Sequence, residues 1–196
     1  MSLPSGPPPT AGVRLDAAPP RPPSRGDERP PMFTRPIDDK RPQEVTVGMG
    51  QVALVETGQV ASAVLGSCIG LVLFQPRRSI AVMSHIVLAE SRGNATSLPG
   101  KFADTAISHM LGLLSARGIL TSQVRAKLAG GATMFGGRGP IRIGDQNHRA
   151  VREILGRFHI PILGEHVGGE QGRRVVFCPT QTRLTVEVAG QTVIVL

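Results

Sequence analysis

The fold of this chain is decided by the stretch from Cys68 to His85, CIGLVLFQPRRSIAVMSH. It holds two apolar runs separated by the polar segment QPRR at 75–78, and a proline among polar residues is typical of a turn. We therefore expect two neighbouring buried strands. The arms at 68–74 and 79–85 are equally long, so an antiparallel hairpin about the turn would return position 85 to the level of position 68.

Further strand and helix patterns surround this hairpin. Apolar residues at helical spacing predict one helix within 101–118 and a second within 144–158, the latter with Val151, Ile154, Leu155 and Phe158 on one face. Strands outnumber helices and their order is mixed, which favours an α/β or α+β class with a mostly β core and two helices packed on it. β-branched residues and alternation predict the strands within 44–57, 60–76, 79–90, 124–135, 160–169, 173–180, 183–190 and 192–196.

The first 42 residues differ from the rest in composition. They hold 12 of the 17 prolines and few aliphatic residues, so they lack the apolar surface that would offset the entropy cost of ordering. We predict a disordered, proline-rich N-terminal tail at 1–42 and a single folded domain at 43–196.

Composition and charge limit the class of protein. The chain opens MSLPSGPPPT, without the basic and apolar segments of a secretory signal, and no apolar run approaches the ~20 residues of a membrane helix. We expect a cytoplasmic protein without membrane insertion. The net charge of +8 is spread along a chain with no Lys/Arg run, no Trp and no Tyr, so we expect no nucleic-acid partner.

Cys68 is one of two cysteines, and its neighbours Gly66, Ser67 and Gly70 are small. Small neighbours let a substrate and backbone N–H groups approach a thiol nucleophile, which needs a base to activate it. His85 would face this thiol if the two strands pair antiparallel, giving a nucleophile–base pair. A histidine in an apolar run is more often a hydrogen-bonded core residue, so both interpretations stand at this point.

Other residues give weaker signals. We interpret Cys178 as a small buried residue, and we expect His166, at the end of a strand beside a glycine loop, to line a pocket. The glycine-rich segment at 130–140 lacks the Gly-Lys-Ser/Thr end of a phosphate-binding loop. Because neither cysteine belongs to a metal-ligand pattern, we predict no cofactor and no metal site.

Six motifs follow one another along the chain: LGSCIGLVLFQP (65–76), AVMSHIVL (81–88), KFADTAI (101–107), AKLAGGATMF (126–135), IGDQN (143–147) and GGEQGRRVVF (168–177). Taken in this order, they resemble the CheD family, the chemoreceptor glutamine deamidases of bacterial chemotaxis. The resemblance covers about residues 44–196 and implies a layered α/β sandwich. It also implies a cysteine-dependent amidohydrolase that converts particular receptor glutamines to glutamates.

The resemblance also implies a set of site residues. Cys68 matches the family nucleophile and His85 its general base and acid, which would form and then hydrolyse a thioester. Ser62 stands where the family usually has a threonine, and it would orient the imidazole. Backbone N–H groups near Gly66 and Ser67 would form the oxyanion pocket.

Partners and departures follow from the same resemblance. The expected substrates are the cytoplasmic domains of chemoreceptors. Some family members bind a CheC-type phosphatase, so the alternative is a regulatory binding module with little or no catalysis. The family's usual arginine is replaced by Gln146, and its Thr-Gly near the end reads Thr180-Gln181, which could alter contacts with substrate or partner.

Overall fold

The computed structural model describes residues 41–93, 96–133, 142–188 and 192–196. Within these ranges the chain forms ten strands, two α-helices and a short 3-10 helix, η1 (Thr121–Gln123). The predicted tail at 1–42 lies almost wholly outside the described residues and stays a prediction.

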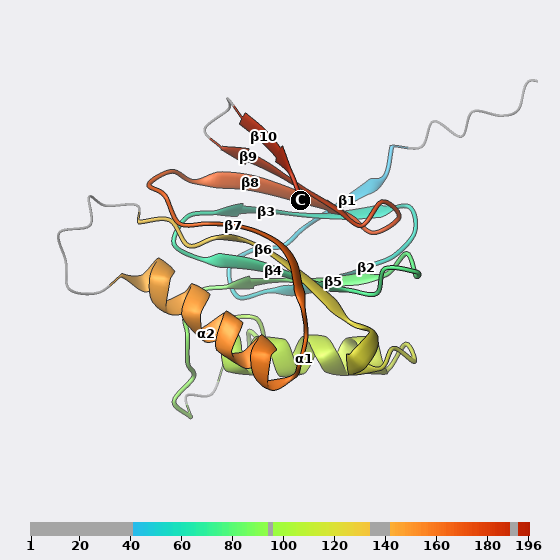
Figure 1. Ribbon diagram of the computed structural model, residues 1–196, viewed down its shortest axis with the longest axis horizontal. Helices are drawn as coiled ribbons and strands as arrows, with labels where there is room; N and C mark the ends of the chain where they lie inside the picture. Colours follow the sequence, from blue (N-terminus) through green and yellow to red (C-terminus); the bar gives the residue numbers. More distant parts are fainter. Residues whose placement is uncertain (1–40, 94–95, 134–141, 189–191) are drawn as a thin grey trace, which may run out of the picture. The chain divides into compact units, whose positions relative to one another are not determined.

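The strands form two five-stranded sheets in the domain after the tail (Figure 1). Each sheet combines strands that lie far apart in the sequence. The first sheet has the order β1 (Gln43–Thr46), β3 (Gln59–Leu65), β8 (Arg173–Cys178), β9 (Arg183–Val188), β10 (Thr192–Val195). The second has the order β2 (Val52–Val55), β5 (Ala81–Ile86), β4 (Ile69–Phe74), β6 (Arg125–Gly130), β7 (Ile162–Val167).

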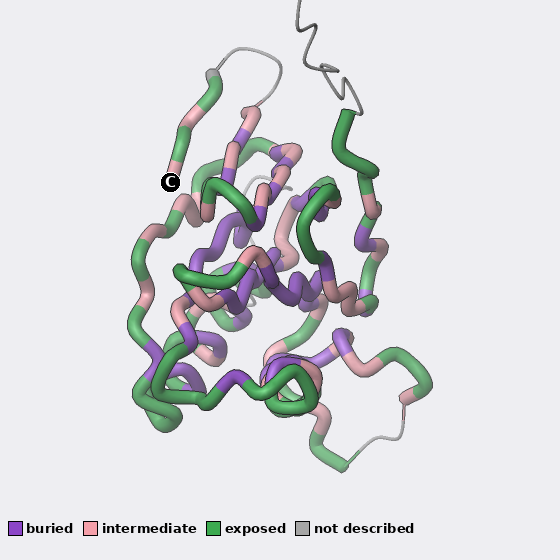
Figure 2. Tube along the Cα trace, turned by 90° about the vertical axis from the view of Figure 1, so that its right-hand side faces the viewer, coloured by how far each residue is buried: buried purple, intermediate pink, exposed green. Residues whose placement is uncertain are grey.

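The domain has three layers, since the second sheet lies between the first sheet and the helices α1 (Ala103–Ser115) and α2 (Ile143–Arg157) (Figure 1). One apolar cluster fills the space between the second sheet and the helices, and another fills the space between the two sheets. Figure 2 shows the buried chain running through the middle of the domain. The predicted layered sandwich with a mostly β core and two helices is confirmed.

β4 is buried on both faces, which explains why its sequence is a continuous apolar run. Ile69, Leu71 and Leu73 belong to the cluster against the helices. Val72 and Phe74 belong to the cluster between the sheets, where the Phe74 ring lies 5.3 Å from that of Phe177 in the first sheet. Successive side chains of β4 therefore pack alternately into the two apolar clusters.

The predicted hairpin is confirmed, because β4 and β5 pair antiparallel from Ile69–Ile86 to Phe74–Ala81. Its register places His85 opposite Gly70 rather than opposite Cys68. β6 pairs antiparallel along the other edge of β4, with Gly130 opposite Ile69. The start of β4 thus lies between strands on both sides.

Both predicted helices are present, within a few residues of the predicted ends. Val151, Ile154 and Leu155 face the core as expected, but Phe158 does not. Helix α2 ends at Arg157, and Phe158 follows it as the C-terminal cap with 40% of its surface exposed. The apolar spacing in the sequence therefore continues one residue beyond the end of the helix.

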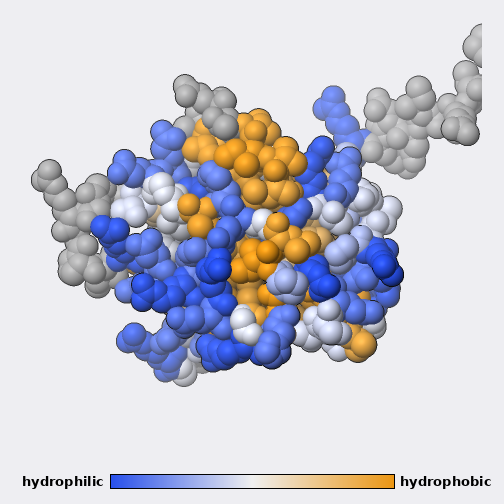
Figure 3. Space-filling view, viewed as in Figure 1, coloured by the Kyte–Doolittle hydropathy of each residue, from blue (hydrophilic) through white to orange (hydrophobic). Residues whose placement is uncertain are grey.

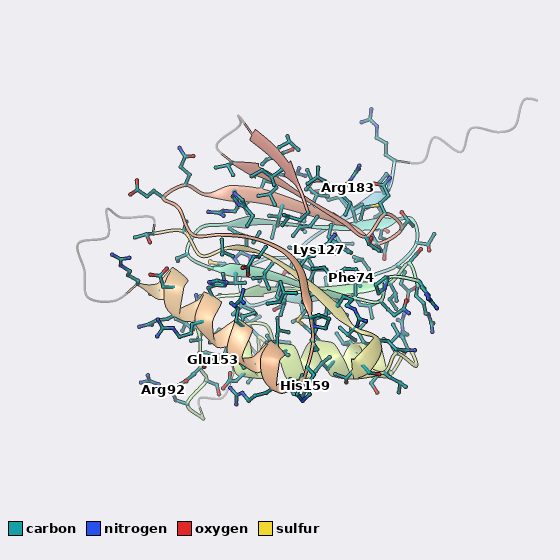
Figure 4. All side chains as sticks on the ribbon, in the orientation of Figure 1. Phe74, Arg92, Lys127, Glu153, His159 and Arg183 are labelled. Carbon is teal, nitrogen blue, oxygen red and sulfur yellow. The ribbon has the colours of Figure 1, made fainter. Side chains whose placement is uncertain are left out.

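Both sheets end on the same side of the domain, at β10 and β7. Figure 3 shows apolar side chains gathered on this face, and Leu163, Val193 and Val195 are more than half exposed. Between the sheets lies Lys127, whose Nζ is 5.5 Å from the Phe74 ring centre (Figure 4). Its ammonium donates to the carbonyl oxygens of Thr182 and Leu196, so it ties the second sheet to the end of the first.

Candidate active site

The segment Gly66-Ser67-Cys68 carries the chain from β3 in the first sheet to β4 in the second. All three residues are half-buried. Two of their carbonyl oxygens accept hydrogen bonds from the segment after β6. The N–H of Ala132 donates to the oxygen of Gly66 at 2.8 Å, and the N–H of Gly131 donates to that of Cys68 at 2.8 Å. The cysteine therefore lies on a short, fixed crossover at one end of the sandwich.

The N–H groups of this crossover are available. Within the described ranges, those of Gly66, Ser67 and Cys68 donate to no backbone or side-chain acceptor. A rigid pair of N–H groups beside a thiol is the arrangement that stabilises an oxyanion formed by attack of that thiol. An oxyanion pocket near Gly66 and Ser67 stays a prediction.

Two glycines let neighbouring segments approach this crossover closely. A side chain on Gly130, whose φ is +116°, would place its Cβ 2.1 Å from the carbonyl oxygen of Cys68. A side chain on Gly144, in the first turn of α2, would lie 2.4 Å from the carbonyl oxygen of Gly131. Both positions therefore require glycine for steric reasons, and this accounts for two of the glycines in the motifs.

His85 is buried near the end of β5, with 4% of its surface exposed. Its backbone is fixed by the segment before β2, since its N–H donates to the oxygen of Gln51 at 3.1 Å and its oxygen accepts from the N–H of Gly50 at 2.9 Å. Its ring Nδ1 lies 3.1 Å from the carbonyl oxygen of Val47. A carbonyl can only accept, so Nδ1 carries the hydrogen and Nε2 keeps a free lone pair.

Cys68 and His85 lie on the same face of the second sheet. Ala81 and Met83 in β5 belong to the cluster between the sheets, and His85 continues their alternation. Cys68 packs against the same cluster and lies two residues before Gly70, the partner of His85. They are diagonal neighbours, a relation that separates Cα atoms by about 7–8 Å. Among the described residues, no hydrogen bond joins the thiol to the imidazole.

The two groups are both uncharged at rest. Burial raises the pKa of the Cys68 thiol. Burial lowers the pKa of His85, and the hydrogen bond to Val47 opposes this only in part. A raised thiol pKa and a lowered imidazole pKa leave a thiol beside a neutral imidazole at neutral pH, rather than a preformed ion pair.

Ser62 lies in β3 on the opposite side of its sheet from this face. Ala61 and Ala63 point into the cluster between the sheets, so Ser62, between them, points away from it. Its hydroxyl is directed toward the carboxylate of Glu44, and Ser62 and Arg174 together lower the pKa of that group. The structure joins Ser62 to the site by its backbone, because its carbonyl accepts the N–H of Val47 at 2.7 Å.

His166 lines a cavity of about 480 Å³, as predicted. The buried guanidinium of Arg173 also lines it, and donates at 2.8 Å both to Nδ1 and to the carbonyl oxygen of His166. Burial, and then the charge of Arg173, lower the pKa of His166. The loop after β7 is linked to the crossover through the end of β6. The N–H of Gly168 donates to the carbonyl oxygen of Gly130 at 2.9 Å.

Cys178 departs from its predicted burial. It is half-buried, and its sulfur lies 3.2 Å from the hydroxyl of Thr180. Both cysteines are free thiols. The described part of the chain holds no group of three or more His, Cys, Asp or Glu side chains placed to bind a metal ion. None of its helices has the length and apolarity to cross a membrane.

Two residues at the site were not among the predicted site residues. Val47 acts through its carbonyl oxygen, which every residue has, so no side-chain pattern could identify it. Asn147 donates to the carbonyl oxygen of Ser67 from α2. Its spacing from Val151 places it on the buried face of the helix, and a polar residue there was an available but unused signal.

Comparison with known proteins gives a consistent result. Residues 87–188 match the family model described as CheD chemotactic sensory transduction. The probable chemoreceptor glutamine deamidase CheD of Oceanobacillus iheyensis is 39% identical over 158 residues, covering 78% of this chain and 95% of the relative. The chemoreceptor glutamine deamidase CheD of Halalkalibacterium halodurans is 39% identical over 75% of this chain and 94% of its own. That of Thermotoga maritima is 34% identical over 74% and 91%, respectively.

Proposed function

This chain belongs to the CheD family, and we propose that it is a chemoreceptor glutamine deamidase. It hydrolyses the side-chain amide of glutamines in chemoreceptors, which gives glutamate and ammonia. The observation that carries the proposal is the placement of Cys68 and His85 on one face of paired strands, beside backbone N–H groups that have no acceptor in the described residues.

The reaction begins with proton transfer from the Cys68 thiol to Nε2 of His85. Since the hydrogen on Nδ1 is held by Val47, Nε2 is the nitrogen that accepts the proton. The sulfur attacks the carboxamide carbon of the glutamine, and a C–S bond forms as the C=O becomes an oxyanion. Backbone N–H groups of the Gly66-Ser67-Cys68 crossover bind this oxyanion, a role in which a single donor contributes about 3 kcal/mol.

The second half of the reaction restores the enzyme. The oxyanion collapses, the C–N bond breaks, and the imidazolium of His85 gives its proton to the departing ammonia. A water molecule then transfers a proton to His85 and attacks the thioester. The C–S bond breaks, the thiolate recovers the proton, and the product is the glutamate side chain.

A base is needed because the thiol is not ionised in advance. Burial raises the pKa of Cys68, so almost no thiolate is present at neutral pH without help. Burial also keeps His85 neutral and therefore able to accept a proton. The two shifts together favour general-base catalysis over a resting thiolate–imidazolium pair.

The orienting group for His85 is the carbonyl of Val47, and Ser62 acts through it. The carbonyl oxygen of Ser62 fixes Val47 by accepting its N–H, while the Ser62 hydroxyl is directed toward Glu44 and helps to lower the pKa of that carboxyl. This refines the role that the family resemblance gives to position 62, where a side-chain hydroxyl would contact the imidazole. A backbone carbonyl serves the same purpose, because it fixes the tautomer and stabilises the imidazolium.

The proposal is tested by ammonia release from a chemoreceptor cytoplasmic fragment. Wild-type protein and the Cys178→Ala variant should release ammonia at equal rates, since Cys178 lies on β8 away from the crossover. Cys68→Ala and His85→Ala should release none above background while keeping the wild-type circular dichroism spectrum. A folded wild-type protein that deamidates no receptor, but binds a CheC-type phosphatase tightly, would instead support the regulatory binding role.

A further inference from the structure

Asn147 lies on the buried face of α2, in the first half of the helix. It is 1% exposed, and Val151, Ile154 and Leu155 continue the same buried face. A buried amide is costly unless it is hydrogen-bonded, whereas an aliphatic side chain at this position would pack without that cost. The polar side chain therefore needs an explanation other than packing.

The amide nitrogen of Asn147 bridges the segment before β4 and the segment after β5, next to the two reacting groups. Nδ2 donates to the carbonyl oxygen of Ser67 at 3.2 Å and to that of Val87 at 2.8 Å. Since both acceptors are carbonyls, the orientation of the amide is fixed by its surroundings. Ser67 immediately precedes Cys68, and Val87 lies two residues after His85.

These bonds lie where the pairing of the two strands stops. The ladder between β4 and β5 ends at Ile69–Ile86, so the next two positions, Cys68 and Val87, belong to no ladder pair. Asn147 joins the chains at that level from the third layer of the domain. Its amide bridges the two chain segments beside the nucleophile, at a level where the β4–β5 ladder has no residue pair.

Asn147 keeps this place although its own bonding is incomplete. Its Oδ1 is buried and has no hydrogen-bond partner in the described part of the chain. An unsatisfied buried acceptor opposes folding, so stability alone does not account for the residue. The two bonds from Nδ2 are what it supplies, and both act on the backbone around the site.

We propose that Asn147 is a positioning residue that sets the separation and alignment of the Cys68 thiol and the His85 imidazole. The pair is only diagonally related across the hairpin, and Asn147 bridges the carbonyl groups of Ser67 and Val87 beside it, so the loss of this bridge changes the distance over which the proton must travel. The role of Asn147 in turnover rests on the proposed deamidase function. Its effect on the thiol can be measured without any receptor.

The kinetic test compares Asn147→Ala with Val151→Ala. The control removes a buried side chain one turn further along the same face, but Val151 belongs to the apolar cluster between the second sheet and the helices and cannot donate a hydrogen bond to the crossover. Asn147→Ala should lower kcat on a receptor fragment about 100-fold, as misplacement of reacting groups does, with KM changed less than about twofold. Val151→Ala should keep its kcat. Equal values of kcat for Asn147→Ala and wild type would overturn the proposal.

The receptor-free test is the pH dependence of Cys68 alkylation by iodoacetamide, in a Cys178→Ala background so that one thiol reports. His85→Ala should lose the part of the rate that persists at neutral pH, and Asn147→Ala should follow it. Val151→Ala should follow wild type. An Asn147→Ala profile that matches wild type refutes positioning, even if no receptor is deamidated.

The same measurement separates this inference from the proposed function. A wild-type protein that shows the His85-dependent rate but no deamidation removes the function and leaves the positioning role intact. If His85→Ala alkylates like wild type, the nucleophile–base pair is wrong and positioning falls with it. Thermal unfolding identifies any variant that fails to fold, and Asn147→Ser, which keeps one short donor, then replaces Asn147→Ala.

Discussion

The imidazole Nδ1 of His85 lies 3.1 Å from the carbonyl oxygen of Val47, in the segment that directly follows β1. This bond joins the segment after β1 to β5 in the second sheet. It fixes the tautomer of a buried histidine and leaves Nε2 free on the face shared with Cys68. The direction of the His85 pKa shift then determines how the reaction depends on pH.

The acid limb of kcat/KM should lie below pH 6.5. His85 acts as a base only when it is unprotonated, and burial lowers its pKa from the ordinary value of 6.5. As the pH falls, activity should therefore be lost at a lower pH than with an exposed histidine as the base. Initial rates measured between pH 4.5 and 8 would check this, with thermal unfolding at each pH as the control for acid denaturation. An acid limb centred above 6.5 would contradict the burial of a neutral imidazole.

Ser62→Ala should lower kcat less than about tenfold, because its side chain points away from the face that carries His85, and its carbonyl, which holds Val47, is retained. A residue whose hydroxyl orients the imidazole directly would cost far more, as in triads where the third member is removed. Steady-state kinetics of Ser62→Ala beside Glu44→Gln separates the two roles. A loss of 1,000-fold or so in Ser62→Ala alone would return the orienting role to its side chain.

Gly130→Ala should lose activity and stability together. Its Cβ would meet the carbonyl oxygen of Cys68 at 2.1 Å, and its φ of +116° is strained for any other residue. Either β6 or the crossover must move, which displaces the nucleophile. The measurement is kcat together with the midpoint of urea unfolding.

The matched control for that variant is Gly156→Ala in α2, where an added Cβ meets nothing within 4 Å. Alanine is the better helix former, so this variant should gain up to about 1 kcal/mol of stability and keep full activity. If Gly130→Ala behaved like Gly156→Ala, close packing beneath Cys68 would not matter for the site.

The hairpin and the helices were predictable because their signals are local. The turn at 75–78 and the apolar runs beside it determine an antiparallel pair, and alternation then puts positions 68 and 85 on one face. Helical spacing located α1 and α2. The error at Phe158 has a physical cause, since a spacing pattern does not show where hydrogen bonding ends.

The division into two sheets was not predictable in the same way. The run from Val60 to Pro76 reads as one apolar stretch, yet it is cut at Gly66 into strands of different sheets. Parallel pairing of β1 with β3, and of β6 with β7, depends on long-range packing. The same limit applies to the site: Cys68 and His85 share a hairpin, whereas Val47 and Asn147 reach it from other elements.

The most direct test of the central claim is mass spectrometry of a chemoreceptor cytoplasmic fragment after incubation with wild-type protein or with Cys68→Ala. We expect wild type to convert particular glutamines to glutamates, each with the mass change from amide to acid, and Cys68→Ala to convert none. Equal conversion by the two proteins would contradict the assignment of Cys68 as the nucleophile. The absence of conversion by a folded wild-type protein on several receptors would contradict the deamidase function itself.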